Sequence, residues 1–419
     1  MRIVFINDKF PPDATGVGNY AFNLAKKIIK KEHEIVVITS TREKKLEGSS
    51  EFDGIKVYRI YSKYSKIFRN YFVIYNFYTI KKVKKILKKE KPDICHLFNI
   101  HEYLSFYIIK ISKQYSKITV WHARDVMSFS SGKLTHFINK DIDYLSIKKD
   151  NYKLPFWAHL KRSGKAFNPL RNFLIRHYLN YADQLFSVSK TLKDAMEANG
   201  INKNIKVLYS GIDTEEFHIT KEELEEFRKK YNIKNDKKIL FFSGRLSYSK
   251  GAMQAILTLK EILKSRNDII LLIAGNKDNY AETLLKFAEK NNFLSSIIFT
   301  GWLNQKDIKK AYLISDVVLN LSLCLDAFPK VNLEAMAAKK PVIGTGFGGT
   351  TEIVLDNETG FIVNPLNVEY IAKKVLYLFD NPDILRQFGT NGYERVKRYF
   401  NLDKITDEIL DYYANFLKR

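Results

Sequence analysis

Two basic residues stand in a short loop that is bounded by glycines. The segment GRLSYSKG, residues 244–251, holds Arg245 and Lys250 between Gly244 and Gly251. A strand-like run precedes the loop and a helical pattern follows it. The combination suits a diphosphate, because the cations and a helix N-terminus all attract negative charge. The alternative is a surface turn with incidental basic residues, which the position of the loop after a strand disfavours.

Two carboxylates form a second candidate group. Asp326 and Glu334 stand eight positions apart in DAFPKVNLEAMAAKKPVIGT, residues 326–345, the first in a loop and the second on the following helix. Carboxylates accept hydrogen bonds from sugar hydroxyls, so the pair could hold a transferred sugar and a nucleotide ribose. A single Asp or Glu is more often a solvated helix cap, and the pair by itself leaves both roles open.

The cysteines do not indicate metal or disulfide chemistry. Only Cys95 and Cys324 occur, in no metal-ligand or CxxC spacing, and we predict no metal and no cofactor. The start MRIVFIND lacks the basic and long apolar regions of a signal peptide. The longest apolar stretch, around residues 71–78, is far shorter than the about 20 residues that cross a bilayer. We therefore expect a cytoplasmic protein.

Strands and helices alternate along the whole chain. A strand over residues 3–7, a helix over 20–31 and a strand over 34–39 form the first βα repeat. Further strands of the first half are predicted over 55–60, 93–97, 118–122, 184–189 and 205–209. A charged stretch over 212–238 contains a short helix, 221–230, and precedes a second series. Its strands are predicted over 239–243, 269–274, 297–300, 316–321, 341–344 and 360–363.

The length of 419 residues exceeds the roughly 250–300 residues at which a single core stops growing. We therefore predict an α/β fold of two Rossmann-like, doubly wound parallel-sheet domains that face each other across a cleft. The predicted ranges are 1–211 for the N-terminal domain, 212–238 for a linker, 239–398 for the C-terminal domain, and 399–419 for a C-terminal helix that packs back on the N-terminal domain.

The net charge of +23 is distributed unevenly. Residues 1–190 hold 36 basic and 16 acidic residues, a net charge of +20, whereas the remainder holds 33 and 30. A lysine-rich proteome explains an excess of lysine but not this asymmetry, so an anionic partner of the first domain is an equal alternative. Phospholipid head groups, a lipid phosphate and nucleic acid are the candidates.

A series of motifs in a fixed order resembles glycosyltransferase family 4, a group of retaining enzymes with the GT-B fold. The resemblance runs nearly end to end, and the order of the motifs makes it specific. The motifs are PPDATGVGNYAFNLAKKI, PDICHLFN, a strand that ends at His122, ADQLFSVSKTLKDAM, KVLYSGIDTEEF, GRLSYSKG, LLIAGN, IIFTGWL, SDVVLNLS, the acidic pair, and GFGGTTEIVLDNETGFIV.

The resemblance implies a nucleotide-sugar donor, linked to UDP or GDP, held by the second domain. Arg245 and Lys250, with Gly244 beside them, would grip the donor diphosphate. Glu334 would hold the ribose hydroxyls and Asp326 would contact the sugar. Charge stabilisation on the leaving diphosphate would then need no metal ion.

Other positions are implied by the same resemblance. Backbone amides of Lys330 and Val331 would donate to the phosphate and sugar, and Leu303 would lie near the base. Gly16 would let its backbone approach the diphosphate. His122 matches a family histidine near the reacting sugar, although a histidine at a strand end is as often a core residue. The expected catalytic residues are Asp326, His122, Arg245 and Lys250.

Five departures from the family pattern leave the identity of the sugar open; two of them are Gly18, where an acidic residue is frequent, and Ser210, which replaces the usual Asn before Gly211. Asp326 stands where the family usually has glutamate, and Pro329 replaces a common glycine and offers no N–H. Thr15 replaces the first of two paired glycines.

The first domain of this fold usually binds the acceptor, so a glycan, a lipid-linked acceptor or an anionic membrane surface is expected there. Candidate segments are residues 61–78, 81–89 and 127–176, although 81–89 alone is better explained as a solvated helix face. We expect no nucleic-acid partner.

Two other classes of protein were weighed. Gly16, Gly18 and Ala21 spell the GxGxxA pattern of a dinucleotide-binding oxidoreductase, but about eight residues separate the pattern from the first strand. A basic nucleic-acid-binding protein would explain the charge, but no helix-turn-helix, zinc or RNP pattern occurs, and the acidic pair would have no role.

Overall fold

Apolar, β-branched runs form the strands of two parallel sheets in the computed structural model, which describes residues 1–13, 16–144 and 147–418. Thr15 lies outside these residues. The chain divides into two compact units. Unit 1 comprises residues 1–136, 148–210 and 402–419, and unit 2 comprises residues 137–147 and 211–401.

Unit 1 is built on an eight-stranded sheet within the described residues, in the order β3-β4-β2-β1-β5-β6-β7-β8. All neighbouring strands are parallel except β3 and β4. The strands are β1 (Arg2–Asn7), β2 (Glu34–Thr41), β3 (Gly48–Phe52), β4 (Ile55–Tyr61), β5 (Ile94–Leu97), β6 (Ile118–Ala123), β7 (Gln184–Ser187) and β8 (Ile205–Val207).

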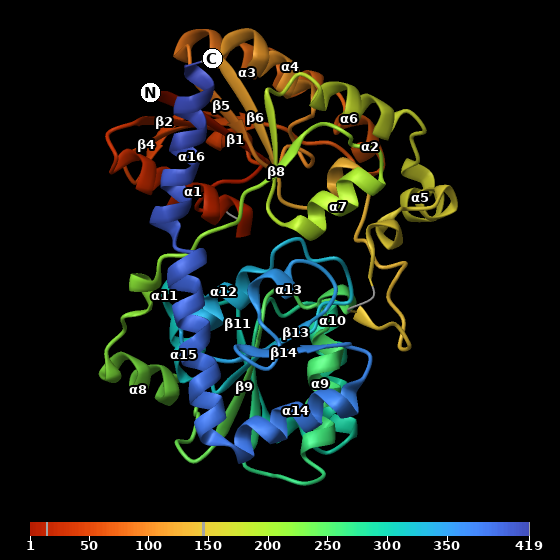
Figure 1. Cartoon of the computed structure of the whole chain (residues 1–419), viewed down its shortest axis with the longest axis vertical. Coiled ribbons are helices and arrows are strands. Elements are labelled where there is room, and N and C mark those ends of the chain that lie inside the picture. The colour runs from red at the N-terminus through yellow and green to blue at the C-terminus, as the bar shows by residue number, and fades with distance from the viewer. Residues whose placement is uncertain (14–15, 145–146, 419) are drawn as a thin grey trace. The chain divides into compact units, whose positions relative to one another are not determined.

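The helices of unit 1 cover both faces of this sheet. Helices α1 and α16 lie side by side (Figure 1), and their apolar residues pack on one face together with Phe5 and Val37. Lys27 of α1 pairs with Asp403 of α16 at 2.9 Å. The helices are α1 (Gly16–Ile29), α2 (Arg69–Phe72), α3 (Phe77–Glu90), α4 (Tyr107–Tyr115), α5 (Phe156–Ser163), α6 (Arg171–Leu179), α7 (Lys190–Ala198) and α16 (Leu402–Leu417).

Unit 2 is built on a six-stranded, all-parallel sheet within the described residues, in the order β11-β10-β9-β12-β13-β14. The order changes direction between β9 and β12, so loops after these strands meet at the switch point where doubly wound sheets bind ligands. The strands are β9 (Lys238–Ser243), β10 (Ile269–Ala274), β11 (Ile297–Gly301), β12 (Val317–Asn320), β13 (Val342–Thr345) and β14 (Gly360–Val363).

Helices again sandwich the sheet of unit 2. Helices α9, α10 and α14 contribute apolar residues to one core layer, and α9 and α14 lie side by side (Figure 1). The helices are α8 (Lys221–Lys230), α9 (Ala252–Ile262), α10 (Asn279–Lys290), α11 (Gln305–Ile314), α12 (Lys330–Ala337), α13 (Thr350–Ile353), α14 (Val368–Asp380) and α15 (Pro382–Tyr399).

The structure divides the chain differently from the sequence-based ranges, and residues 211 and 399–401 belong to unit 2. Residues 212–238, expected to be a linker, belong to unit 2, where Phe227 of α8 is buried. Residues 137–147, expected in the first domain, also belong to unit 2, because the Tyr144 hydroxyl donates to the Ile362 carbonyl at 2.8 Å. The final helix α16 belongs to unit 1.

Candidate active site

The loop after β9 takes its shape from two glycines with positive φ. Gly244 has φ +126° and Gly251, which precedes α9, has φ +75°. A Cβ atom on Gly251 would lie 1.8 Å from the carbonyl oxygen of Leu321, so only glycine allows α9 to begin this close to the loop after β12. The amide of Leu323 donates to the carbonyl of Ser249 at 2.9 Å and joins the two loops.

Lys250 forms an ion pair with Asp326, which lies on the loop after β12. Both side chains are largely buried, with 28% of Lys250 and 16% of Asp326 exposed. Burial by itself would lower the pKa of Lys250, but the Asp326 carboxylate outweighs it and the pKa is raised. The Ser322 hydroxyl also donates to Asp326, at 3.3 Å. The structure thus brings Lys250, which is predicted to bind the diphosphate, into contact with Asp326, which is predicted to contact the sugar.

Arg245 lies in the same loop as Lys250, but its side chain has different surroundings. Its side chain is exposed, and no described residue forms a hydrogen bond or ion pair with it. Its charge is close enough to Lys250 to oppose the rise in the Lys250 pKa. The guanidinium therefore keeps its donors available for an anion that comes to the Lys250 side of the loop.

The main chain of Asp326 is held by the loop after β13. Asp326 forms an isolated β-bridge with Gly348, and the amide of Gly349 donates to the Asp326 carbonyl at 2.8 Å. Gly348 has φ +118°, and a Cβ atom there would lie 2.2 Å from the Asp326 oxygen. The paired glycines of GFGGTTE thus let the loop approach Asp326 closely.

Glu334 is anchored at both carboxylate oxygens. The hydroxyl of Tyr312 on α11 donates to one oxygen at 2.8 Å, and the Lys330 ammonium lies 3.3 Å from the other. The Tyr312 hydroxyl also lies 2.8 Å from the Ser243 hydroxyl, at the end of β9. Burial and the Glu334 charge raise the pKa of Tyr312 well above its ordinary value, so Tyr312 stays a neutral donor. The remaining lone pairs of Glu334 can accept from sugar hydroxyls.

The N-terminus of α12 carries the predicted backbone donors. The helix begins at Lys330 after Pro329, and no side chain caps its first turn. The first amides of a helix have no intrahelical acceptor, so those of Lys330 and Val331 are suited to an anion. Pro329 has no N–H, so the backbone hydrogen-bond donors at this end of the helix begin with the amide of Lys330.

Leu303 lies shortly after β11, and its position near the base stays a prediction. It is only 8% exposed, whereas its neighbour Trp302 is 68% exposed directly after β11. The exposed indole was missed from the sequence, although it stands within the motif IIFTGWL. Tyr312 and Ser322 were missed as well, because only the fold brings them to Glu334 and Asp326.

The two predicted site residues of unit 1 lie in different surroundings. Gly16 is exposed at the first position of α1, and no described atom lies within 4 Å of the place its Cβ would take. His122 is fully buried in β6, with its Nε2 atom 3.1 Å from the Leu208 carbonyl. Burial, Arg124 and His96 lower its pKa well below the ordinary value. Its Nδ1 atom is buried without a hydrogen-bond partner among the described residues, and both roles considered for His122 from the sequence stay predictions.

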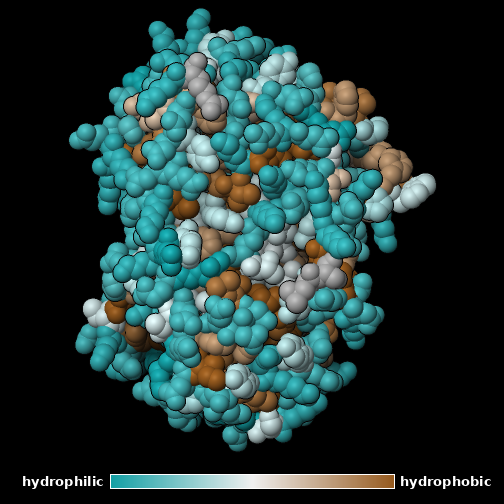
Figure 2. Space-filling view, viewed as in Figure 1, coloured by the Kyte–Doolittle hydropathy of each residue, from teal (hydrophilic) through white to brown (hydrophobic). Residues whose placement is uncertain are grey.

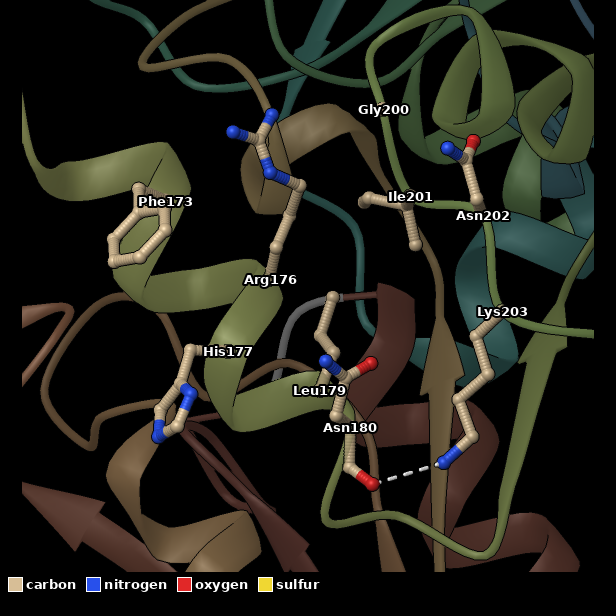
Figure 3. Close-up of a pocket in the computed structure, with 9 residues that line it drawn as sticks. All are labelled: Phe173, Arg176, His177, Leu179, Asn180, Gly200, Ile201, Asn202 and Lys203. Carbon is tan, nitrogen blue, oxygen red and sulfur yellow. Dashed lines mark hydrogen bonds between the residues drawn. The ribbon is translucent and has the colours of Figure 1, made fainter.

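An open pocket of about 630 Å³ lies in unit 1, and none of the residues that line it is a predicted site residue (Figure 3). It lies beside the C-terminal end of α6 and the loop before β8 and is lined in part by Arg176 and Lys203. The Lys203 ammonium donates to the Asn180 carbonyl at 3.1 Å, as Figure 3 shows. Cations commonly satisfy the last carbonyls of a helix, which accounts for the basic lining.

Residues 1–13, 16–144 and 147–418 contain neither a metal-binding cluster nor a helix suited to cross a membrane. No group of three or more His, Cys, Asp or Glu side chains in these ranges is arranged to hold a metal ion. No helix in the same ranges combines the length and the apolar character that a membrane crossing requires.

Two parallel-sheet α/β units and a cation–carboxylate site at the switch point of the second define a GT-B glycosyltransferase. Comparison with known proteins agrees with this class. Residues 14–216 match the family described as Glycosyltransferase Family 4, and residues 223–395 match Glycosyl transferases group 1. The chain therefore belongs to glycosyltransferase family 4 and is an enzyme of that class, so the oxidoreductase alternative is wrong.

Relatives and solved structures are similar over long ranges. An uncharacterized glycosyltransferase of Methanocaldococcus jannaschii is 26% identical to this chain. The alignment covers 99% of this chain and 98% of the relative. The alpha-monoglucosyldiacylglycerol synthase of Streptococcus pneumoniae is 24% identical, over 60% of this chain and 57% of its own.

Two solved structures share the fold. Sucrose-phosphate synthase of Thermosynechococcus elongatus has a TM-score of 0.76 at 17% identity, over 100% of this chain and 99% of that chain. HepE of Anabaena, solved with UDP-glucose, has a TM-score of 0.71 at 15% identity, over 99% of this chain and 100% of that chain.

Proposed function

We propose that the enzyme is a retaining glycosyltransferase that moves a sugar from a UDP- or GDP-linked donor to an acceptor hydroxyl. The observation that carries this proposal is the Lys250–Asp326 ion pair beside Arg245. A diphosphate requires cations and a sugar requires hydrogen-bond acceptors, and this group supplies both. The UDP-glucose complex of the Anabaena neighbour supports a uridine nucleotide as the first donor to test.

Donor binding changes the partner of Lys250 in this proposal. The diphosphate competes with Asp326 for the Lys250 ammonium, and Arg245 supplies a second cation. Asp326 then accepts hydrogen bonds from the sugar hydroxyls instead. Glu334, already held by Tyr312, accepts from the ribose.

The transfer step follows from these positions. The bond between the anomeric carbon and the diphosphate oxygen breaks, and its electron pair goes to the leaving diphosphate. Lys250 and Arg245 stabilise that charge without a metal ion. The acceptor oxygen bonds to the same face of the anomeric carbon, and its proton passes to the leaving diphosphate. A covalent route through Asp326 is less favoured, because its carboxylate accepts hydrogen bonds from the sugar hydroxyls in this proposal.

The acceptor belongs to glycolipid, polysaccharide or lipid-linked glycan synthesis in this proposal. The Streptococcus pneumoniae relative carries the name of a glycolipid synthase, which supports a lipid acceptor. The net charge of +20 on residues 1–190 supports peripheral association of a cytoplasmic enzyme with the inner face of a membrane.

Calorimetric titration with UDP, GDP and their sugars tests the donor. One nucleotide class should bind, and Lys250→Gln and Arg245→Gln should weaken it. NMR of the product with a lipid-linked acceptor should show an unchanged anomeric configuration, with turnover maintained in a chelator. Inverted product or turnover lost in the chelator would overturn the mechanism, and absence of binding for all nucleotides would overturn the donor assignment.

A further inference from the structure

Helix α5 (Phe156–Ser163) leaves its largest apolar side chains exposed, whereas two of its polar side chains are half-buried. Phe156 and Trp157 are 60% and 75% exposed, whereas His159 and Arg162 are half-buried. A surface helix ordinarily buries its apolar stripe and exposes its charges. The inverted arrangement in α5 therefore calls for an apolar environment outside the protein.

Helix α6 repeats the inversion at its first turn. Arg171 is 6% exposed and donates to the Ser130 carbonyl at 3.3 Å, and burial lowers its pKa to about 9. Leu170 and Phe173, on either side of it, are exposed. A charged residue is thus buried where two apolar residues are left outside.

The exposed residues of α5 and α6 are continuous with those of α2. The Tyr71 hydroxyl donates to the Phe167 carbonyl at 3.3 Å, and the rings of Phe167 and Phe156 lie 5.9 Å apart. In Figure 2, tan and brown residues gather at the upper right, where Figure 1 has α5 and α6. The aromatic surface, as we name it, consists of Phe68, Tyr71, Phe156, Trp157, Leu170 and Phe173, which are between 50% and 75% exposed.

The segments that carry the aromatic surface are rich in basic residues and contain no acidic ones. Residues 54–89 contain no Asp or Glu and eleven Lys or Arg, and residues 151–182 contain no Asp or Glu and six. Lys161 on α5 and Lys165 between α5 and α6 are exposed. A second copy of the chain would bring two such positive surfaces together, which disfavours self-association as the reason for the exposed rings.

We propose that the aromatic surface docks on a bilayer that contains anionic phospholipids. The rings enter the interface between head groups and acyl chains, and Lys161 and Lys165 contact the head groups. This inference rests on the membrane association proposed above and names the residues that make it. It does not require sugar transfer, which is tested separately by the variants of Lys250 and Arg245 in unit 2.

Tryptophan fluorescence can report the docking directly. The chain has three tryptophans, of which Trp121 is buried and Trp157 and Trp302 are exposed. Vesicles of phosphatidylglycerol with brominated acyl chains should quench the tryptophan fluorescence of the Trp302→Phe variant, which retains Trp157. They should leave the fluorescence of the Trp157→Phe variant largely unquenched. Quenching that persists in Trp157→Phe and is lost in Trp302→Phe would place the membrane contact elsewhere and overturn the proposal.

Variants test the contribution of the rings and the charges. Phe156→Ser/Trp157→Ser should reduce partition onto phosphatidylglycerol vesicles by about ten-fold or more, since each ring removes apolar area from the interface. Tyr370→Ser/Tyr399→Ser, which alters exposed rings of unit 2, should partition like the wild type. Lys161→Gln/Lys165→Gln should weaken binding, and salt of about 1 M should weaken it in every variant.

Two controls keep the outcome decisive. Thermal unfolding should be unchanged in the serine variants, because the replaced rings are exposed; nucleotide binding without vesicles should also be unchanged. Failure of nucleotide binding in the wild type would concern the proposed reaction and not this surface. Equal partition of the ring variant and the wild type would overturn the proposal, as would a lipid-free dimer that the ring variant abolishes.

Discussion

Replacing Lys250 by glutamine removes one positive charge and keeps a polar side chain of similar length. Lys250 is only 28% exposed and pairs with a carboxylate that is 16% exposed, so solvent screens this charge less than a surface lysine. We expect kcat to fall about 10²–10³-fold, or about 2.7–4 kcal/mol, as for the loss of other preorganised charge stabilisers. Arg245→Gln should cost less and depend more on salt, because Arg245 is exposed.

The same replacement also leaves Asp326 without its cation. The free energy of unfolding should fall by about 1–3 kcal/mol, since the pair is partly but not fully buried. The double variant Lys250→Gln/Asp326→Asn replaces the ion pair by two neutral amides. It should recover most of the stability, while kcat stays low because no cation is restored.

The assay combines steady-state sugar transfer with urea unfolding. Lys306→Gln is the control, because its pair with Glu223 lies at the surface, with the lysine 67% exposed. That variant should change stability by less than about 1 kcal/mol and leave kcat unchanged. A Lys250→Gln enzyme with near-wild-type kcat would refute the reasoning, and so would recovery of kcat in the double variant.

Three further predictions concern the surroundings of the site and the core. Tyr312→Phe removes the hydroxyl that donates to Glu334, and one such bond contributes about 0.5–1.5 kcal/mol, so donor titration should show a KM about two- to ten-fold higher with kcat little changed. Gly348→Ala should lower the Tm and the activity, because its Cβ would lie 2.2 Å from the Asp326 oxygen at φ +118°; an unchanged Tm would contradict this. The lowered pKa of His122 means that the unfolded chain binds a proton below about pH 6.5 which the folded chain does not, so stability falls as the pH decreases. Urea unfolding between about pH 6 and pH 5 measures how steeply the free energy of unfolding falls with decreasing pH. In His122→Gln this pH dependence should be smaller by up to about 1.4 kcal/mol per pH unit.

Local patterns were sufficient for the strands of unit 2. Each lies within one residue of its predicted bounds, because a buried parallel strand reads as a continuous apolar run between turn residues. Strand β3 (Gly48–Phe52) was not predicted. Its sequence GSSEF is polar, since β3 is an exposed edge strand that depends on antiparallel pairing with β4.

The candidate site was predicted in part. Motif order indicated Arg245, Lys250, Asp326 and Glu334, and the structure places the first three together. The ion pair between residues 250 and 326 could not be predicted, because the loops after β9 and β12 meet only when these strands become neighbours.

The sequence by itself determined the alternation of strands and helices, the two α/β domains and the family, because these depend on residue type and on spacing within short segments. Only the tertiary structure decided which partner each charged group has and which face of α5 points outwards. Apolar and polar residues at helical spacing are compatible with either face inside. The packing of α5 against distant segments leaves Trp157 outside and Arg162 half-buried.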